Sequence, residues 1–233
     1  AVIDRSGFVF HAQRLSPRRL AALAAAKVKA TTLARAAGAR RGSAGEAVDF
    51  VAKHALSNPV LVDVTADDTS TTLKRALSAG MHVVLANKRP LTTHRKLYDE
   101  LRALADERGR RLLHETTVGA GLPIIDTFYK LAESGDRVSR IEGCPSGTLG
   151  FLFGEMGRGR QFSEALRRAI SKGYPEPDPR EDLSGTDVAR KALILGRLLG
   201  FQGELGDIEV ESLVPAKGKR LPLAEFLAQR GVA

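Results

Sequence analysis

Short runs of apolar, largely β-branched residues alternate with helical patterns, and this alternation limits what the 233-residue chain can fold into. Three runs have the composition of strands buried on both faces: "PVLVDV" at 59–64, "HVVLA" at 82–86 and "RLLHE" at 111–115. Helical patterns lie between them at 70–80 and 92–109. Strand–helix–strand units of this kind predict right-handed crossovers and an α/β, doubly wound parallel sheet.

The two ends of the chain indicate that this sheet is incomplete. The opening run "AVIDRSG" at 1–7 is typical of a second strand, and no G-x-G-x-x-G turn occurs in the sequence. We therefore expect residues 1–113 to form a nucleotide-binding domain that lacks its first strand and Gly-rich loop. Residues 114–233 are expected to form an α+β catalytic and dimerisation domain, with a weak strand at 137–143. Its final helical pattern, 223–233, stops abruptly, which predicts a C-terminal truncation.

Composition excludes several classes of protein. The net charge is +9, but the basic residues are scattered and aromatic residues make up only 5%, so we expect no nucleic-acid partner. No apolar run reaches the ~18 residues of a membrane span, and we expect no membrane association. The single cysteine, Cys144, excludes an intrachain disulfide and a multi-cysteine metal site. A reducing compartment such as the cytoplasm fits this usage.

Polar residues follow the predicted strands at the points where they end. In an open α/β sheet, ligands bind outside the carboxyl ends of the strands. This rule brings together a set of amide, hydroxyl and charged side chains: Asp4, Arg5, Thr65, Asn87, Lys88 and Glu115. Asp4 suits a ribose hydroxyl and Arg5 suits a 2′-phosphate, so both NAD and NADP stay open. Each residue alone is equally typical of a helix cap or a surface turn.

The stretch "GYPEPDPREDLSGTDVARK" at 173–191 contains several carboxylates within and after a loop that is stiffened by prolines. Prolines at alternate positions within 175–179 favour an extended segment. Alternation would then turn Glu176, Asp178 and Arg180 to one side. Preorganised carboxylates of this kind can hold a substrate ammonium and hydroxyl group.

A helix is predicted to follow this loop and to end at Gly200. Ser184 and Asp187 resemble a capping box at its start. Asp187 and Lys191 are four residues apart and therefore share one face. A surface ion pair worth about 0.3–0.5 kcal/mol would explain this spacing equally well. A desolvated lysine beside carboxylates could instead move a proton.

Read as a whole, this stretch is similar to the signature of homoserine dehydrogenases. Three further segments match that family in the right order: "VVLANKRPLT", "ETTVGAGLPII" and "GCPSGTLGFLF". The similarity extends from Asn58 to about Pro215. "HALSNPVLVDVTADDTS" and "IEVESLVPA" look most like the bifunctional aspartokinase–homoserine dehydrogenases, which implies an excised portion of such a protein.

The resemblance implies NAD(P)-dependent interconversion of L-homoserine and L-aspartate 4-semialdehyde. It makes Lys191 the general acid/base and Lys88 a catalytic lysine on the cofactor side. The implied substrate-binding residues are Glu176, Asp182, Asp187 and Tyr174, and the cofactor-binding residues are Thr65, Lys88, Gly173 and Arg5. A sodium site would use the Glu115 side chain and the carbonyl groups of Val118, Ala120 and Leu122. The family also implies a homodimer in the cytoplasm, or in the plastid stroma of a photosynthetic eukaryote.

Two other interpretations stay open. A semialdehyde dehydrogenase would need an activated thiolate, and Cys144 is the sole candidate. An inactive fragment would instead act as a dimerisation or regulatory module. Failure to bind any nicotinamide cofactor would favour the second.

Overall fold

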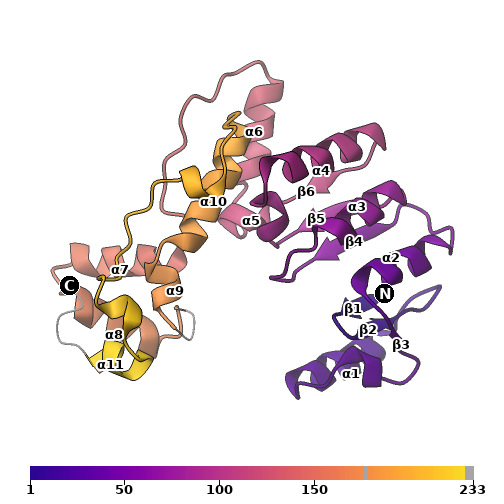
Figure 1. Ribbon diagram of the computed structural model, residues 1–233, viewed down its shortest axis with the longest axis horizontal. Coiled ribbons are helices and arrows are strands. Elements are labelled where there is room, and N and C mark those ends of the chain that lie inside the picture. Colours follow the sequence, from indigo (N-terminus) through magenta and orange to yellow (C-terminus); the bar gives the residue numbers. More distant parts are fainter. Residues whose placement is uncertain (176–177, 229–233) are drawn as a thin grey trace. The chain divides into compact units, whose positions relative to one another are not determined.

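The protein is described by a computed structural model that covers residues 1–175 and 178–228. The chain divides into two compact units (Figure 1). The first contains Ala1–Pro90 and Lys96–His114, and the second contains Leu91–Arg95 and the chain from Glu115 onwards. The polypeptide therefore enters the second unit for five residues, returns to the first, and leaves it again after His114.

A three-stranded parallel sheet forms the centre of the first unit. Its strands are β4 (Val60–Asp63), β5 (His82–Leu85) and β6 (Leu112–Leu113), in that order. Both neighbouring pairs are parallel, with Val60 opposite His82 and Val83 opposite Leu112. The β-branched runs in the sequence thus predicted the strands and their direction correctly.

The crossovers between these strands are helical, as the apolar spacing predicts. Helix α3 (Ser70–Ser78) buries Leu73 and Leu77 completely, and Gly80 follows it with φ of 79°, which a glycine adopts without strain. Helix α4 (Arg95–Glu107) buries Tyr98 and Leu101. The remaining helical elements of the first unit are α1 (Pro17–Val28), η1 (Leu33–Arg35), α2 (Ala44–Ala52) and η2 (Arg89–Leu91).

The opening run does not join the parallel sheet. Strand β1 (Val2–Asp4) pairs antiparallel with β2 (Gly7–Val9), which pairs antiparallel with β3 (Arg40–Arg41). In the described structure β1 is therefore hydrogen-bonded to β2 and not to a strand of the parallel sheet, so its predicted place as the second strand of that sheet stays a prediction. The local cause is a tight turn, because Asp4 Oδ1 accepts hydrogen bonds from the backbone N–H (2.8 Å) and hydroxyl (2.6 Å) of Ser6.

All the regular secondary structure in the described residues of the second unit is helical. Its elements are α5 (Thr116–Gly119), α6 (Ile124–Glu133), α7 (Gly147–Gly157), α8 (Phe162–Ser171), α9 (Arg180–Leu183), α10 (Thr186–Leu198), η3 (Leu205–Asp207), η4 (Gly218–Arg220) and α11 (Leu223–Ala228). The strand expected at 137–143 is absent from the described structure, where this segment is irregular. A strand needs a neighbouring edge to satisfy its backbone, and the described part of this unit offers none.

A hydrophobic core joins α7, α8, α9 and α11 in the second unit. Leu152 and Leu183 lie at its centre, with Phe226 fully buried against them.

Within the part of the chain that the structure describes, no helix is long and apolar enough to cross a bilayer.

A buried arginine holds helix α10 to the five-residue segment 91–95. The Arg197 side chain is 0% exposed, and its guanidinium donates hydrogen bonds to the carbonyl oxygens of Leu91 (2.7 Å) and Thr93 (2.9 Å). It also pairs with Glu204 Oε2 at 3.1 Å. Glu204 Oε1 accepts the backbone N–H of Arg95 at 2.7 Å, so the segment is fixed at both ends.

We expect Arg197→Met to lower the free energy of unfolding of the second unit by about 3 kcal/mol. The reason is that two carbonyl groups and a carboxylate lose a buried cationic donor. Chemical denaturation followed by circular dichroism measures the change. Arg190→Met, on the same helix at a partly exposed position, is the matched control and should cost less than about 1 kcal/mol. Equal losses in the two variants would contradict the role given to Arg197.

Candidate functional site

In the first unit, a buried carboxylate organises the carboxyl ends of β4 and β5. Asp63 is 5% exposed and accepts hydrogen bonds from the Thr65 backbone N–H (2.9 Å) and the Thr69 hydroxyl (2.5 Å). The Asn87 amide also donates to it, at 3.0 Å, and to the hydroxyl of Thr65 at 3.2 Å. Thr65 and Asn87 therefore meet as the strand-end rule predicts, and Lys88 follows directly at a partly buried position. Sequence reasoning missed Asp63, although a carboxylate inside an apolar run was a visible signal.

Asp4 and Arg5 lie at the end of β1, in different surroundings. The Asp4 carboxylate accepts hydrogen bonds from Lys27 Nζ (2.7 Å) and from the Leu33 backbone N–H (3.0 Å). Burial alone would raise the pKa of Asp4, but the hydrogen bonds from Lys27, Ser6 and Leu33 outweigh it and hold this pKa well below its usual range. The Arg5 side chain is 93% exposed, with its Nε 4.0 Å from Asp67 Oδ2.

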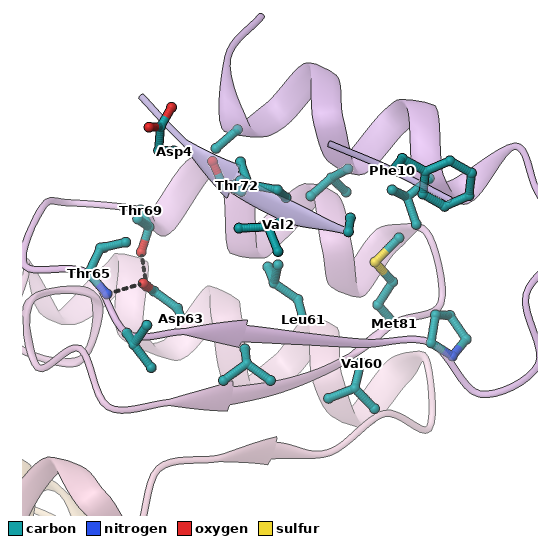
Figure 2. Close-up of a pocket in the computed structure, with 18 of the residues that line it drawn as sticks. Val2, Asp4, Phe10, Val60, Leu61, Asp63, Thr65, Thr69, Thr72 and Met81 are labelled. Atoms are coloured by element: carbon teal, nitrogen blue, oxygen red, sulfur yellow. Dashed lines mark hydrogen bonds between the residues drawn. The ribbon is translucent and has the colours of Figure 1, made fainter. Parts of the chain in front are cut away.

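A cavity of about 880 Å³ lies between β1 and β4 in the first unit. Figure 2 shows Val2 and Leu61 on its two sides and Asp4, Asp63 and Thr65 together at one end. The other end is apolar, with Phe10 and Met81.

The polar end of the cavity holds carboxylate and hydroxyl groups that are largely engaged within the protein. Asp4 already accepts four hydrogen bonds, from Ser6, Lys27 and Leu33, so a ribose hydroxyl would have to displace one of these donors. The Asn87 amide likewise donates to Asp63 and to the carbonyl oxygen of Asp67. A diphosphate prefers a cradle of backbone N–H groups at a helix start. The described residues around the cavity instead present carboxylates, including Asp67 and Asp68. The described lining of the cavity therefore does not favour a diphosphate.

In the second unit, Lys191 occupies a nearly enclosed position on α10. Its side chain is 15% exposed, and its ammonium group lies 2.8 Å from Asp187 Oδ2 and 2.7 Å from the carbonyl oxygen of Pro145. The pairing at four-residue spacing is as predicted from the sequence. A backbone carbonyl from a distant loop makes this more than a surface ion pair, because it fixes the direction of the ammonium group.

Asp182 and Tyr174 are joined by a residue that the sequence analysis did not single out. The hydroxyl of Thr148, which is 5% exposed, lies 3.1 Å from Asp182 Oδ1 and 3.2 Å from the carbonyl oxygen of Tyr174. Thr148 sits in the first turn of α7, after the N-cap Ser146. Gly173 directly precedes Tyr174 and has φ of 70°, a conformation that favours glycine. Thus Thr148 brings together two of the predicted substrate residues.

The proline-rich loop differs from the prediction in two ways. Asp178 and Arg180 form a bidentate ion pair, and Arg180 Nη1 also donates to the carbonyl oxygen of Leu221 at 2.7 Å. These contacts stabilise the loop. Arg180 begins the short helix α9 and does not continue an extended segment. The preceding Pro179 is compatible with this helix, because proline is well tolerated at a helix start. Glu176 lies outside the described residues.

The capping box expected at the start of α10 is also absent. The N-cap of this helix is Gly185 with φ of 76°, and it has no side-chain capping bond. A Cβ atom at this position would come within 2.8 Å of Val210. Both the backbone conformation and this close approach require glycine, which displaces Ser184 from the capping position.

The predicted cation loop is compact. Both oxygens of Glu115 accept backbone N–H groups at the start of α6, from Ile125 and Asp126, each at 2.8 Å. The carbonyl oxygen of Leu122 accepts the N–H of Ile124 at 2.9 Å, and Ala120 has φ of 52°. Val118, which is 3% exposed, lies in the turn of α5 that precedes this bend. No group of three acidic, histidine or cysteine side chains that could hold a metal occurs in the described residues.

Comparison with known proteins matches both parts of the chain to models of the same family. Residues 9–115 match the family model "Homoserine dehydrogenase, NAD binding domain", and residues 123–231 match the family model "Homoserine dehydrogenase". The bifunctional aspartokinase/homoserine dehydrogenase of Haemophilus influenzae is 46% identical over 169 residues, which are 72% of this chain and 21% of that protein. The homoserine dehydrogenase of Emericella nidulans is 40% identical over 196 residues, covering 78% of this chain and 53% of the relative.

Solved structures agree with this assignment. A hyperthermophilic archaeal homoserine dehydrogenase in complex with NADPH has a TM-score of 0.65 and 30% identity, covering 84% of this chain and 58% of that one. The enzyme of Thermoplasma acidophilum has a TM-score of 0.63 and 25% identity, with coverages of 90% and 62%. The chain thus spans about a fifth of the bifunctional relative and between half and two thirds of these other proteins.

The lowered pKa of Asp4 predicts a defined dependence of stability on pH. A carboxylate whose pKa is depressed in the folded state stabilises the protein above its unfolded pKa of about 3.9, and this contribution is lost as the pH falls through the folded pKa. The difference in free energy of unfolding between the unmodified protein and Asp4→Asn should therefore stay constant at neutral pH and shrink below about pH 4.

Urea unfolding at a series of pH values measures this difference. Asp49→Asn is the control, because Asp49 pairs with Arg75 at an exposed position and should contribute little at any pH. A difference for Asp4→Asn that grows on acidification would contradict the interpretation.

Proposed function

Because the chain belongs to the homoserine dehydrogenase family, we propose that it carries out, or forms part of a polypeptide that carries out, the reversible NAD(P)-dependent reduction of L-aspartate 4-semialdehyde to L-homoserine. The reaction lies in amino-acid biosynthesis. The first unit would bind the dinucleotide and the second would bind the substrate and move the proton.

The position of Lys191 is the observation that carries this proposal. Its ammonium group has a partly enclosed site and two fixed acceptors, Asp187 Oδ2 and the carbonyl oxygen of Pro145. Lys191 would donate a proton to the aldehyde oxygen in reduction and accept it in oxidation. Asp187 would act as a positioning residue that keeps the ammonium group oriented.

Substrate recognition would use the carboxylates near the start of α10. Homoserine carries an ammonium group and a hydroxyl group, and both can donate hydrogen bonds to Asp182. Thr148 supports this role, because its hydroxyl holds Asp182 in place. Glu176 and Tyr174 would complete the substrate site.

The cofactor supplies a hydride acceptor or donor at its nicotinamide ring when bound. Thr65, Lys88 and Gly173 are the residues proposed to contact it. The exposed Arg5 favours a 2′-phosphate, whereas Asp4 would bind a free 2′-hydroxyl group only in exchange for one of its present hydrogen-bond donors. Titration with NADH and NADPH by quenching of cofactor fluorescence would decide between them.

Substitution of Lys191 tests the assignment of the proton donor. Lys191→Ala should lower kcat by ~10²–10⁴-fold, the usual contribution of general acid–base catalysis. Asp182→Asn should act mainly on KM, since it weakens binding of ground state and transition state alike. Homoserine-dependent reduction of NAD or NADP, measured in the polypeptide in which the chain occurs, gives both constants.

Lys172→Ala serves as a control, because Lys172 is exposed at the end of α8 and should leave both constants unchanged. If Lys191→Ala kept a near-normal kcat while Lys88→Ala abolished activity, proton transfer would be assigned to Lys88. The Asp187–Lys191 pair would then be a structural feature of α10.

The loop after Glu115 would hold a monovalent cation such as sodium through the Glu115 carboxylate and the carbonyl oxygens of Val118, Ala120 and Leu122. Hard oxygen ligands suit such an ion. Sodium chloride at about ten times the dissociation constant should then stabilise the second unit by ~1.4 kcal/mol relative to choline chloride at equal ionic strength. Glu115→Gln should remove this difference, and an unchanged difference would exclude the site.

Assembly and location are further parts of the proposal. A homodimer fits the exposed apolar side chains Phe153 and Met156 on α7, and sedimentation velocity would detect it. We propose a cytoplasmic or plastid location, which fractionation of the source cells would test.

A further inference from the structure

We propose that Arg180 is a positioning residue for homoserine binding, because it fastens the loop and helix that carry predicted substrate residues to segment 218–226. The identity of the substrate rests on the proposed function, whereas the attachment is a property of the fold. Its consequence is that substrate affinity depends on a segment about 40 positions away in the sequence, to which no substrate contact is assigned.

The Arg180 guanidinium contacts two separate parts of the second unit. Its Nε donates to Asp178 Oδ1 at 2.9 Å, and its Nη2 donates to Asp178 Oδ2 at 2.5 Å. On the other side, Nη1 donates to the carbonyl oxygens of Leu221 (2.7 Å) and Gly218 (3.3 Å). A guanidinium is planar and carries its donors in fixed directions, so it can hold both sets of acceptors at once.

Segment 218–226 is itself held by the hydrophobic core of the second unit. Phe226 is 0% exposed within that core, and its ring centre lies 5.4 Å from the guanidinium carbon of Arg180. Gly218 packs against the same ring, where a Cβ atom would come within 3.1 Å. The segment therefore offers Arg180 a fixed surface, to which a cation–π contact adds.

Helix α9 depends on such contacts because it is only one turn long. A single helical turn fixes many backbone dihedral angles for few hydrogen bonds and is unstable by itself. Arg180 begins this turn, and the predicted substrate residue Asp182 follows two positions later. Leu183, which is 1% exposed, fixes the far end of the turn in the core. Loss of the Arg180 contacts would therefore change the direction of the Asp182 carboxylate.

Asp178 belongs to this attachment and not to the predicted substrate site. Its Oδ1 also accepts the backbone N–H of Arg180 at 3.0 Å, which fixes the entry into α9. The hydrogen bonds from Arg180 lower the pKa of Asp178, so this carboxyl group is ionised at neutral pH. Asp178 thus holds Arg180, while Asp182 is the carboxylate proposed to hold the substrate.

Steady-state kinetics test the proposal in the polypeptide in which the chain occurs. Arg180→Met keeps a long side chain but removes every donor. It should raise KM for homoserine at least about tenfold and leave kcat and KM for the cofactor within about twofold, because ground state and transition state lose the same substrate contact. A KM for homoserine that stayed within about twofold would overturn the proposal, and so would an equal rise in both KM values.

Arg167→Met is the matched control. Arg167 is exposed on the neighbouring helix α8, so its substitution should leave all three constants unchanged.

The conservative variant Arg180→Lys separates geometry from charge. A lysine keeps the positive charge, but its single ammonium group cannot hold Asp178 and the carbonyl oxygen of Leu221 in fixed directions together. KM for homoserine should therefore stay at least about fivefold above that of the unmodified enzyme. Recovery of a normal KM would assign the effect to charge alone and overturn the attachment.

A double substitution tests whether Asp178 and Arg180 act as one unit. Adding Asp178→Asn to Arg180→Met should raise KM for homoserine little further, because the two side chains form a single attachment. Effects that multiply would show independent roles and contradict the proposal.

Hydrogen exchange followed by mass spectrometry tests the attachment without substrate. Arg180→Met should speed exchange in both 180–185 and 218–226, with the middle of α10 unchanged, and Arg167→Met should speed neither. Arg180→Lys gives the same comparison if Arg180→Met does not fold. Faster exchange in only one of the two segments would refute the attachment.

The unmodified polypeptide separates failure of this inference from failure of the proposed function. If it showed no homoserine-dependent reduction of NAD or NADP, the proposed function and the substrate role of Arg180 would both fall, and hydrogen exchange would still decide the attachment. Normal activity together with an unchanged KM in Arg180→Met would refute the inference alone.

Discussion

The first unit depends on the buried carboxylate of Asp63. Its two oxygens take a backbone N–H, a hydroxyl and an amide, and these donors come from the loop after β4 and from the end of β5. A buried carboxyl group of this kind is tolerable because both of its oxygens accept hydrogen bonds. The carboxyl ends of two strands are thereby fixed against each other, and Thr65, Asn87 and Lys88 obtain defined positions. The predicted site residues Thr65 and Asn87 are thus positioned by a residue that the sequence analysis did not single out.

The features that were predicted correctly from the sequence follow from short local patterns of residues. The strands at 60–63 and 82–85 follow from valine-rich runs, and the strand at 112–113 follows from a short apolar run between helical patterns. The contact between Asp187 and Lys191 follows from helical spacing. Thr65 and Asn87 meet because parallel strands end at a common edge.

The features that were not predicted depend on contacts between residues that are far apart in the sequence. Thr148 reaches Asp182 across 34 positions, and Lys191 reaches the carbonyl group of Pro145 across 46. Strand β1 folded into a hairpin because the Asp4–Ser6 turn competes locally, while no strand of the described chain lies between β1 and β4. The roles of all the predicted site residues, including Lys191, Lys88 and Glu115, stay predictions, because the position of a side chain in the fold does not by itself specify its ligand.

The path of the chain through segment 91–95 has a consequence for dissection of the protein. These five residues belong to the second unit, although the first unit flanks them on both sides. No single cut of the polypeptide can therefore separate the units. A fragment that ends at His114 would carry the carbonyl groups of Leu91 and Thr93 without the guanidinium of Arg197 that satisfies them. A shuffled or truncated gene that joins at this position would therefore have to supply replacement donors for these two carbonyl groups.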